Sequence, residues 1–273
     1  ASVVAVDLLK GESKFGVYDL SGEALYHRKG SRLAETDDLE GALIGELEKL
    51  LTETERDFEL RGEVKSVPPT RAICLGVPAA IDSESGRVTG ASLFSQLRET
   101  NLKELLERRF DVTCFVENDV KLAAFAENRL GQGKQHRNLV YVDINDGIGA
   151  GIIIDNRILR GADGLAGEIG YTLTSPADLE YTAATRGYLE NSASIEALGR
   201  AATEAIHRGV GTQMARGRHR GDPPLRPHQV YQAALDGDEL ARTLIGRSVD
   251  LLSVAVLNLV LVVNPEIIVV GGD

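Results

Sequence analysis

A repeated pattern of apolar runs and aspartates constrains this chain most strongly. Near its start, an apolar run ends at Asp7, a glycine turn follows, and a second run ends at Asp19. The same order recurs around Asp143 and Asp155, which are spaced like the first pair. Each segment is typical of a β-meander, in which short turns join successive strands. An internal duplication explains the shared spacing, and two unrelated meanders with aspartates at their turns are the alternative.

Two duplicated meanders predict two α/β lobes, which we assign to residues 1–117 and 118–273. Two lobes imply a cleft, and clefts are where ligands bind. Residues of alternating or helical periodicity predict the other elements. Strands are expected at 2–8, 14–20, 23–28, 72–77, 113–116, 139–143 and 266–270, with two more short strands on either side of a turn at 155–156 and a hairpin around 85–86. Helices are expected at 38–53, 102–110, 119–130, 194–208, 229–235 and 238–263.

The charge of the chain argues against direct DNA binding. Its 273 residues are 43% hydrophobic, enough for two lobes with proper cores, and carry a net charge of −11. Nucleic-acid binding depends on neutralising phosphates with basic side chains. Three arginines, Arg216, Arg218 and Arg220, lie in a Gly- and Pro-rich stretch. They could contact an anion or DNA, and a solvated connector is the other interpretation.

Cysteine usage and apolar runs indicate the cytoplasm. Cys74 and Cys114 lie inside apolar strand runs, as buried thiols of a reducing compartment would. The N-terminal stretch lacks the basic region of a signal peptide. The longest apolar stretch, Val249 to Val263, contains Asp250 and Asn258 and is shorter than a membrane span requires. It predicts a buried core helix, and no membrane partner is expected.

One stretch carries most of the polar residues that suggest a site. A short strand delivers Asn118 and Asp119 to the start of a helix, and the next strand runs into a turn with Gly147, Gly149 and Gly151. A carboxylate at a strand-to-helix junction beside a glycine-rich turn is a common way to build a small-molecule site. An Asn–Asp pair also offers both donors and acceptors, which a polyol needs.

The chain resembles the ROK family, which joins sugar-responsive bacterial repressors and sugar kinases. The resemblance implies a two-lobed actin-like ATPase fold, which is ribonuclease H-like, with duplicated β-meander lobes. The matching pieces keep the family's order along nearly the whole chain. They are L-G-V-P at 75–78, E-N-D at 117–119, G-I-G-A-G at 147–151, A-G-E-I-G at 166–170, G-Y-L-E at 187–190 and N-P-E-I-I-V-V-G-G at 264–272.

The resemblance assigns roles to several polar residues. In family kinases, the residue matching Asp119 is the base that accepts the proton of the sugar hydroxyl, and in repressors it binds the sugar. A helix-terminal carboxylate that only stabilises the helix is the alternative for Asp119. Glu168 and Glu190 match positions that bond sugar hydroxyls, and the alternative is surface glutamates. Ser92 stands where the family has a sugar-contacting asparagine.

The family's zinc site is expected to be absent. The histidine position holds Tyr171, and the cysteine positions hold Tyr181, Ala183 and Tyr188, none of which is a good zinc ligand. Tyr171 could still bond or stack on a sugar, or it could simply pack. No metal and no cofactor are therefore expected, apart from magnesium ATP if the chain is a kinase.

The phosphate loops are altered as well. The resemblance makes Asp7, Gly147, Gly149, Gly271 and Gly272 remnants of a nucleotide site. Two substitutions bring negative charge to it, because Glu12 lies in the first loop and Asp146 replaces a threonine in the second. Two like charges about 4 Å apart repel by roughly 4 kcal/mol at an effective dielectric near 20. The alternative for Asp146 is an outward side chain that caps the turn.

Three functions remain open at this point. The first is the sugar-sensing effector domain of a ROK regulator, with DNA contacted only through an N-terminal module absent from this sequence. The second is an ATP-dependent ROK sugar kinase acting on a hexose or amino sugar, with Asp119 catalytic. The third is a homologue that binds neither ligand. The resemblance also implies a homodimer or homotetramer, and a C-terminal end shorter than that of other members.

Overall fold

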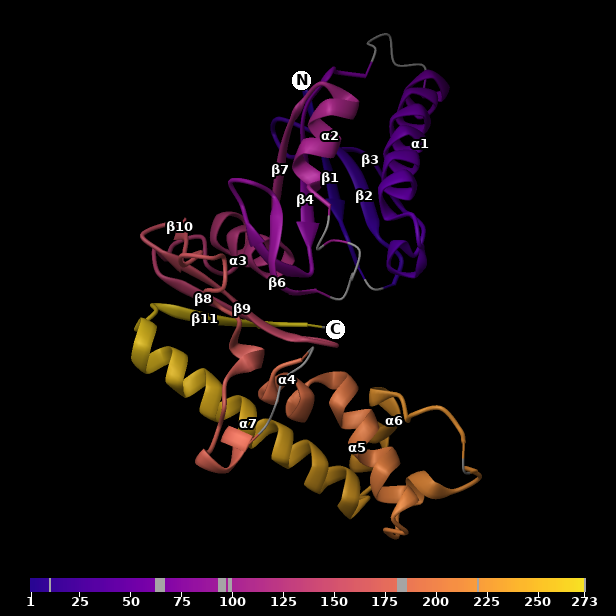
Figure 1. The fold of residues 1–273 in the computed structure, drawn as a ribbon. Helices are drawn as coiled ribbons and strands as arrows, with labels where there is room; N and C mark the ends of the chain where they lie inside the picture. The colour runs from indigo at the N-terminus through magenta and orange to yellow at the C-terminus, as the bar shows by residue number, and fades with distance from the viewer. Residues whose placement is uncertain are drawn as a thin grey trace. The chain divides into compact units, whose positions relative to one another are not determined.

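The computed structural model describes residues 1–9, 11–61, 67–92, 97, 100–180, 186–219 and 221–272 (Figure 1). The chain folds into two compact units. Unit 1 contains residues 1–123 and 160–166, and unit 2 contains residues 124–159 and 167–273. The division falls within α3 (Asp119–Arg129), the helix that follows the boundary expected after residue 117. The return of residues 160–166 to unit 1 has no counterpart in the sequence-based division.

Unit 1 is built on a five-stranded sheet of order β3-β2-β1-β4-β7. β1 and β2 pair antiparallel, as do β2 and β3, whereas β1, β4 and β7 run parallel. Burial alternates along β1, so one face of this strand packs into the core. The strands are β1 (Ser2–Asp7), β2 (Lys14–Asp19), β3 (Ala24–Lys29), β4 (Thr70–Val77) and β7 (Thr113–Asn118).

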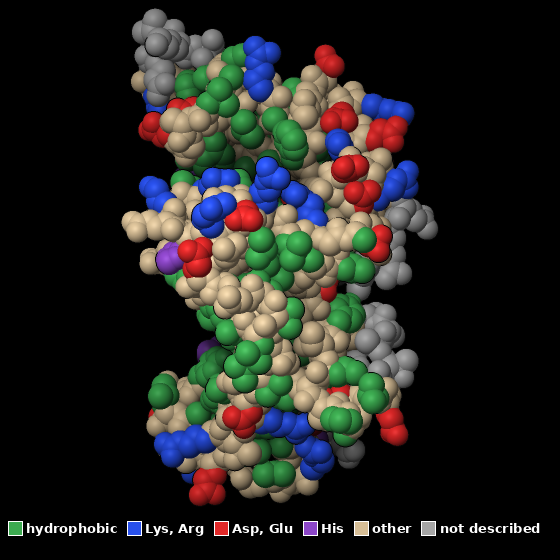
Figure 2. Space-filling model, turned by 90° about the vertical axis from the view of Figure 1, so that its left-hand side faces the viewer, with side chains coloured by type: hydrophobic (Ala, Val, Ile, Leu, Met, Phe, Trp, Pro, Cys, Tyr) green, Lys and Arg blue, Asp and Glu red, His purple; other side chains and the backbone are tan. Residues whose placement is uncertain are grey.

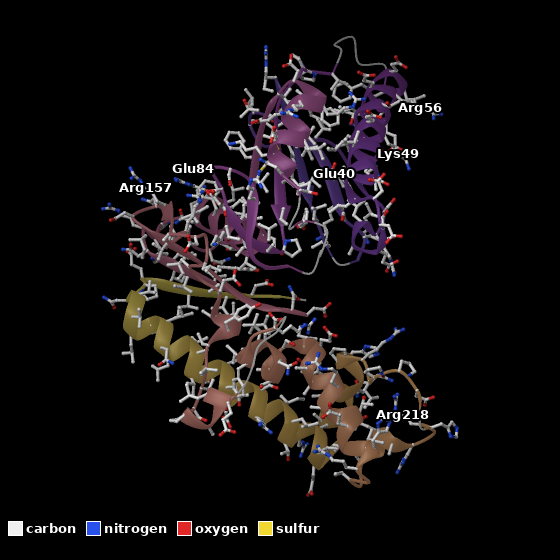
Figure 3. All side chains as sticks on the ribbon, in the orientation of Figure 1. Glu40, Lys49, Arg56, Glu84, Arg157 and Arg218 are labelled. Atoms are coloured by element: carbon white, nitrogen blue, oxygen red, sulfur yellow. The ribbon has the colours of Figure 1, made fainter. Side chains whose placement is uncertain are left out.

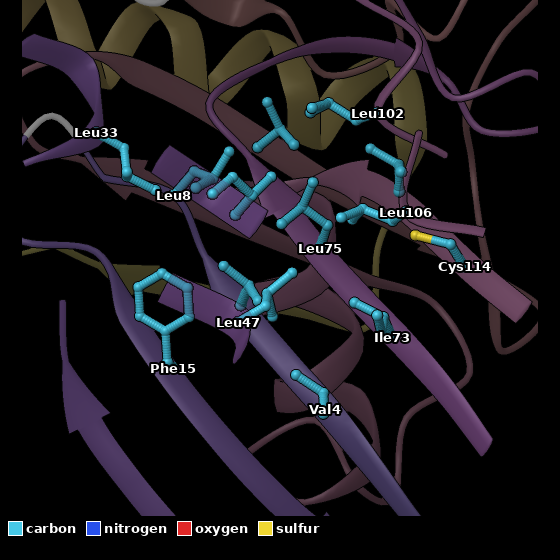
Figure 4. Close-up of a cluster of buried hydrophobic side chains, with 14 of the residues drawn as sticks. Val4, Leu8, Phe15, Leu33, Leu47, Ile73, Leu75, Leu102, Leu106 and Cys114 are labelled. Atoms are coloured by element: carbon cyan, nitrogen blue, oxygen red, sulfur yellow. The ribbon is translucent and has the colours of Figure 1, made fainter. Parts of the chain in front are cut away.

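Helices α1 (Leu39–Leu60) and α2 (Leu102–Phe110) pack against this sheet and form the first core (Figure 4). Asp38 caps α1 by accepting a hydrogen bond from Gly41 N at 2.9 Å. The helix continues beyond the expected end at residue 53 because buried Thr54 and Phe58 extend its inner stripe. β5 (Ala79–Asp82) and β6 (Arg87–Ser92) form the expected hairpin, and η1 (Leu33–Glu35) is a short 3-10 turn.

Unit 2 repeats the same topology. β8 (Leu139–Ile144), β9 (Ile148–Ile154) and β10 (Arg157–Ile158) form a meander, and β11 (Ile267–Gly271) pairs parallel with β8. The sheet order β10-β9-β8-β11 reproduces β3-β2-β1-β4. The duplicated meanders and the α/β class expected from the sequence are therefore confirmed.

The rest of unit 2 is helical. α7 packs on the second core with the sheet, and it joins α5 and α6 around a third core. The 3-10 turns η3 (Ile169–Tyr171), η4 (Pro176–Glu180) and η5 (Gln213–Ala215) lie between the longer elements. The helices are α4 (Tyr188–Ala193), α5 (Ile195–His207), α6 (Pro227–Leu235) and α7 (Glu239–Val263). α4 was not expected from the sequence, because a helix of 6 residues is too short for a periodic pattern.

The prediction that α7 is a buried core helix is wrong. One side packs on the second core through Leu252, Ala255 and Leu259, but Leu257 is 56% and Leu261 73% exposed. The described residues of unit 2 contain no counterpart of α2 and β7 of unit 1. By length and apolar content alone, α7 could also span a membrane. This is weak evidence for a membrane span, because one side of α7 packs on a core.

Charged side chains are mixed at the surface. On the face drawn in Figure 2, Lys and Arg side chains lie among Asp and Glu, and hydrophobic side chains also reach the surface. In the loop between α5 and α6, Arg218 donates a hydrogen bond to the carbonyl of Pro223 in the same loop (Figure 3). This contact favours the solvated connector among the two interpretations of the arginine-rich stretch.

Candidate functional site

The parallel strands of unit 1 bring Asp7 and the Asn118–Asp119 pair to one edge of the sheet. Asp7 pairs with Gly76, and Gly76 pairs with Glu117, so the three residues lie on one line across β1, β4 and β7. Asn118 and Asp119 follow immediately beyond this line. The carboxyl ends of parallel strands are where α/β proteins bind ligands. Unit 1 therefore presents its predicted polar residues where this topology favours a site.

Asn118 uses both ends of its side chain within unit 1. It is 7% exposed, and its Oδ1 caps α3 by accepting a hydrogen bond from Lys121 N at 3.0 Å. Its Nδ2 donates to the carbonyl of Ala79 at 3.1 Å. These bonds fix the residue that precedes Asp119. Direct contact between Asn118 and a sugar stays a prediction. The two hydrogen bonds also hold the backbone that positions Asp119.

Asp119 is the first residue of α3 and is half-buried. Its Oδ1 accepts a hydrogen bond from Val120 N at 2.8 Å, which places the carboxylate at the positive end of the helix dipole. The helix-terminal interaction considered above is therefore present. A carboxylate also accepts hydrogen bonds from hydroxyl groups.

Ser92 reaches the same neighbourhood through the hairpin. It is the last residue of β6 and pairs with Ala79, whose carbonyl accepts the bond from Asn118. The backbone of Ser92 is therefore one residue pair away from Asn118. Its side chain lies outside the part of the chain that the structure describes. The register nonetheless brings two of the predicted residues together within unit 1.

Sequence reasoning missed two buried charges at this junction. Glu117, 5% exposed, accepts a hydrogen bond from Arg160 Nε at 2.7 Å. Lys121, 1% exposed, donates from Nζ to the carbonyl of Gly164. Both partners lie 43 residues further along the chain. No local sequence pattern predicts these distant partners. The only signal in the sequence is the presence of charged residues in the E-N-D-V-K stretch.

In unit 2, Glu190 contacts the turn between β8 and β9. The carboxylate Oε2 of Glu190 accepts a hydrogen bond from Ile148 N at 3.3 Å. A Cβ added to Gly147 would lie 3.1 Å from that oxygen, so this position leaves little room for a side chain. The structure therefore joins Gly147, a predicted nucleotide-loop remnant, and Glu190, a predicted sugar residue.

Close backbone approaches explain the glycines around Tyr171. A Cβ on Gly187 would lie 2.0 Å from the carbonyl oxygen of Gly170 and 2.4 Å from Tyr171 Cα. Glycine is therefore required at this contact. Tyr171 lies in η3 and is 39% exposed, and Glu168, which precedes η3, is half-buried. Sugar contacts by Glu168, Tyr171 and Glu190 stay predictions.

Electrostatic partners surround Glu190. Its side chain lies 3.6 Å from Arg186, which also pairs with Glu196 at 2.7 Å. Burial raises the pKa of Glu190, and the amide of Ile148 and the charge of Arg186 offset only part of that effect. Burial opposes the charge of Arg186, but Glu196, Glu190 and Asp146 raise its pKa. Asp146 thus lies within electrostatic range of a cation.

The nucleotide-loop remnants of unit 2 meet around Asp143. Asp143 pairs with Gly149 on one side and with Gly271 on the other. A Cβ on Gly271 would lie 2.1 Å from the hydroxyl of Tyr141, and Gly272 has a φ of +136°. Gly272 therefore requires glycine, because a Cβ there would also lie 2.1 Å from the carbonyl oxygen of Ile144, whereas a side chain at Gly271 would have to displace the Tyr141 ring. This convergence places the remnants at one end of the sheet.

Other predicted positions are partly described. Glu12 is exposed and lies 3.8 Å from Lys29 across the first meander. Of the positions matching the family's zinc ligands, Tyr171 and Tyr188 are described, whereas Tyr181 and Ala183 lie outside the described residues. The expected absence of zinc stays a prediction.

Comparison with known proteins identifies relatives of both functional kinds. The xylose repressor of Caldicellulosiruptor bescii is 32% identical over 215 residues, which cover 77% of this chain and 53% of the repressor. The glucokinase of Thermotoga maritima is 30% identical over 201 residues, covering 72% of this chain and 62% of the enzyme. This chain thus spans little more than half the length of the curated relatives it matches.

A solved structure and a family model also match this chain. A ROK family transcriptional regulator, described as a homologue of the E. coli Mlc protein, superposes with a TM-score of 0.76 and 26% identity, over 99% of this chain and 65% of the regulator. The ROK family pattern matches residues 3–273. With its duplicated meanders and its motifs in the order of the family, the chain belongs to the ROK family.

Proposed function

We propose that this chain is the sugar-sensing effector domain of a ROK transcriptional regulator. The observation that carries the proposal is a contrast between two sets of residues. The carboxylates matching sugar contacts, Asp119, Glu168 and Glu190, are all present, whereas the turn matching the phosphate loop carries Asp146. Sensing needs the first set and places no demand on the second.

Charge at the phosphate turn opposes nucleotide binding. Asp143 lies near the end of β8 and Asp146 lies in the turn that follows, and Asp143 already accepts hydrogen bonds from Tyr141 and Asn145 at 3.1 and 2.9 Å. A phosphate about 4 Å from a carboxylate is repelled by roughly 4 kcal/mol at an effective dielectric near 20. Replacing threonine by Asp146 also removes a hydroxyl donor. These features support a domain that binds sugar without ATP.

The best alternative is an ATP-dependent sugar kinase, and one electrostatic interaction favours it. Arg186 lies within electrostatic range of Asp146 and could offset its charge beside a nucleotide. In that case Asp119 would act as the base that takes the proton from the sugar hydroxyl. A coupled assay with magnesium ATP and a panel of hexoses and amino sugars separates the two functions. We expect background rates, and turnover that Asp119→Asn abolishes would establish the kinase.

The decisive experiment uses the full-length protein and DNA from its own promoter. A sugar shifts an equilibrium between two states only by its differential affinity for them, and couplings are typically ~1–3 kcal/mol, or roughly 5- to 150-fold in DNA affinity. We expect one sugar among D-glucose, D-xylose and N-acetyl-D-glucosamine to change operator affinity in this range. Asp119→Ala should keep DNA binding and lose the response.

The control is Asp37→Ala, which removes an exposed aspartate. It should respond to sugar as the wild type does. An Asp119→Ala protein that responds normally would place the sugar elsewhere. The proposal also includes a cytoplasmic protein, a homodimer or homotetramer, and DNA contact through a module outside this sequence.

A further inference from the structure

Residues 160–166 form a strap on unit 1. They belong to unit 1, although Leu159 before them and Gly167 after them belong to unit 2. The chain therefore leaves unit 2 for this short segment and returns at once. Such an excursion needs attachments, because fixing each residue of a loop costs roughly 1–2 kcal/mol in backbone entropy.

Three side chains of unit 1 attach the strap. Glu117 Oε2 accepts a hydrogen bond from Arg160 Nε at 2.7 Å, and the hydroxyl of Thr89 donates to the carbonyl of Asp163, also at 2.7 Å. Lys121 Nζ donates to the carbonyl of Gly164. The attachments come from β7, α3 and β6, so the strap is tied both to the β7–α3 junction and to the β5–β6 hairpin.

The strap also lies directly against the hairpin. Gly164 is buried with a φ of +74°, and a Cβ there would lie 2.2 Å from the carbonyl oxygen of Ile81 in β5. Glycine is therefore the residue this contact requires. The hairpin carries Ser92, and the junction carries Asn118 and Asp119. The strap thus connects the two parts of unit 1 that hold the candidate sugar residues.

Lys121 occupies an unfavourable position unless it anchors the strap. It is the third residue of α3, where the helix dipole disfavours positive charge, and it is 1% exposed. Burying an ammonium group is costly unless hydrogen bonds and opposite charge compensate it. The strap carbonyl supplies a hydrogen bond, and buried Glu117 lies four residues earlier, in β7. Nothing about helix α3 itself calls for a lysine here.

We propose that Lys121, supported by the Glu117–Arg160 pair, is a positioning residue for sugar binding in unit 1. It holds the strap, and the strap fixes the hairpin relative to the junction that aims Asp119. The inference rests on the proposed sugar-binding function. Lys121 itself does not touch the sugar.

The test compares Lys121→Met with the wild type. Methionine keeps the length of the side chain and removes the donor. We measure amide hydrogen exchange at 118–121 and 161–166, and titrate D-glucose, D-xylose and N-acetyl-D-glucosamine by calorimetry well below the melting temperature. Exchange should accelerate in both segments, and sugar affinity should fall about tenfold. Lys121→Arg, which keeps a donor, should recover part of both. Lys134→Met, an exposed lysine beyond α3, is the matched control and should change neither.

A second pair of variants tests the support from Glu117. Arg160→Met should loosen the strap, whereas Arg157→Met, on an arginine that projects from β10 (Figure 3), should not. Arg160→Met should add little to the effect of Glu117→Gln in exchange rates, because both remove the same ion pair.

The outcomes separate this inference from the proposed function. A folded Lys121→Met protein with wild-type exchange, or with faster exchange and unchanged sugar affinity, overturns the positioning role. If no sugar of the panel binds the wild type, the proposed effector fails, and the positioning role, which rests on it, is withdrawn. The exchange data then report only whether Lys121 anchors the strap.

Discussion

The carboxylate of Glu190 accepts a hydrogen bond from the amide of Ile148, 3.3 Å away, at the turn between β8 and β9. The two residues are 42 positions apart in the chain. The contact ties α4 to the meander turn and leaves the half-buried carboxylate beside Arg186. Both the titration and the packing of this turn can be tested.

Glu190 should make the protein less stable as the pH rises. Burial raises its folded pKa above the ordinary value of 4.5, so the folded state holds the proton more tightly than the unfolded state. Stability from this group is therefore full below the unfolded pKa and is lost as pH rises through the folded pKa. Melting temperatures of the wild type and Glu190→Gln, measured between about pH 4.5 and 7.5, should diverge in favour of the variant at the higher pH. Glu180→Gln, an exposed glutamate, is the control. A constant difference across the range would contradict the shift.

Two glycine substitutions should act in opposite directions. Gly167 has a φ of +92°, and a Cβ there would lie 1.9 Å from the carbonyl oxygen of Ala150. We expect Gly167→Ala to cost at least ~2 kcal/mol, because both backbone strain and a clash with main chain must be relieved. Gly246 lies in α7 with no atom within 4 Å of an added Cβ, so Gly246→Ala should stabilise by up to ~1 kcal/mol.

Urea unfolding of both glycine variants measures the two changes. The pair is informative because the chemical change is identical and only the surroundings differ. A stable Gly167→Ala protein would mean that the segment before Glu168 approaches β9 less closely than the structure indicates.

Cys114 should be chemically silent in the folded protein. Burial raises the pKa of its thiol to about 12, with Glu107 adding to the effect, and the side chain is fully buried. At pH 8 only about one thiol in ten thousand would be ionised, and the thiolate is the reactive form. In a Cys74→Ser variant, a disulfide reagent should therefore react with Cys114 only after denaturation. Rapid reaction of the native variant at pH 8 would show that the strand opens readily.

The purified protein should contain no stoichiometric zinc. Tyr171 and Tyr188 stand at two of the positions that the family uses for ligands, and a tyrosine hydroxyl is a poor ligand for zinc. We expect elemental analysis to find less than ~0.1 zinc per chain, and a chelator to leave the melting temperature unchanged. A value near one zinc per chain that survives dialysis would require ligands elsewhere in the protein.

Local patterns determined much of the fold. Apolar runs that end at aspartates identified the meander strands, and the repeated Asp7–Asp19 spacing identified the duplication, which the matching sheet orders confirm. The helix from Leu102 to Phe110 has the predicted bounds, because an Asn cap and a left-handed residue at its end are both encoded locally. The motif order was also enough to recognise the family. These features depend on residues close together in the chain.

What only the tertiary structure decided depends on contacts between distant residues. The apolar run of α7 predicted burial, but a helix face is buried only if another element covers it, and no pattern within the helix specifies that element. In the sequence, Asn118 and Glu190 are simply polar candidates. In the fold, the Asn118 amide donates a hydrogen bond to the carbonyl of Ala79, and the Glu190 carboxylate accepts one from the amide of Ile148. In the sequence, Lys121 resembles an ordinary surface lysine. In the fold, Gly164, 43 residues later in the chain, accepts a hydrogen bond from its ammonium group. A buried charge is tolerated only where a partner meets it, and the position of that partner is a property of the fold.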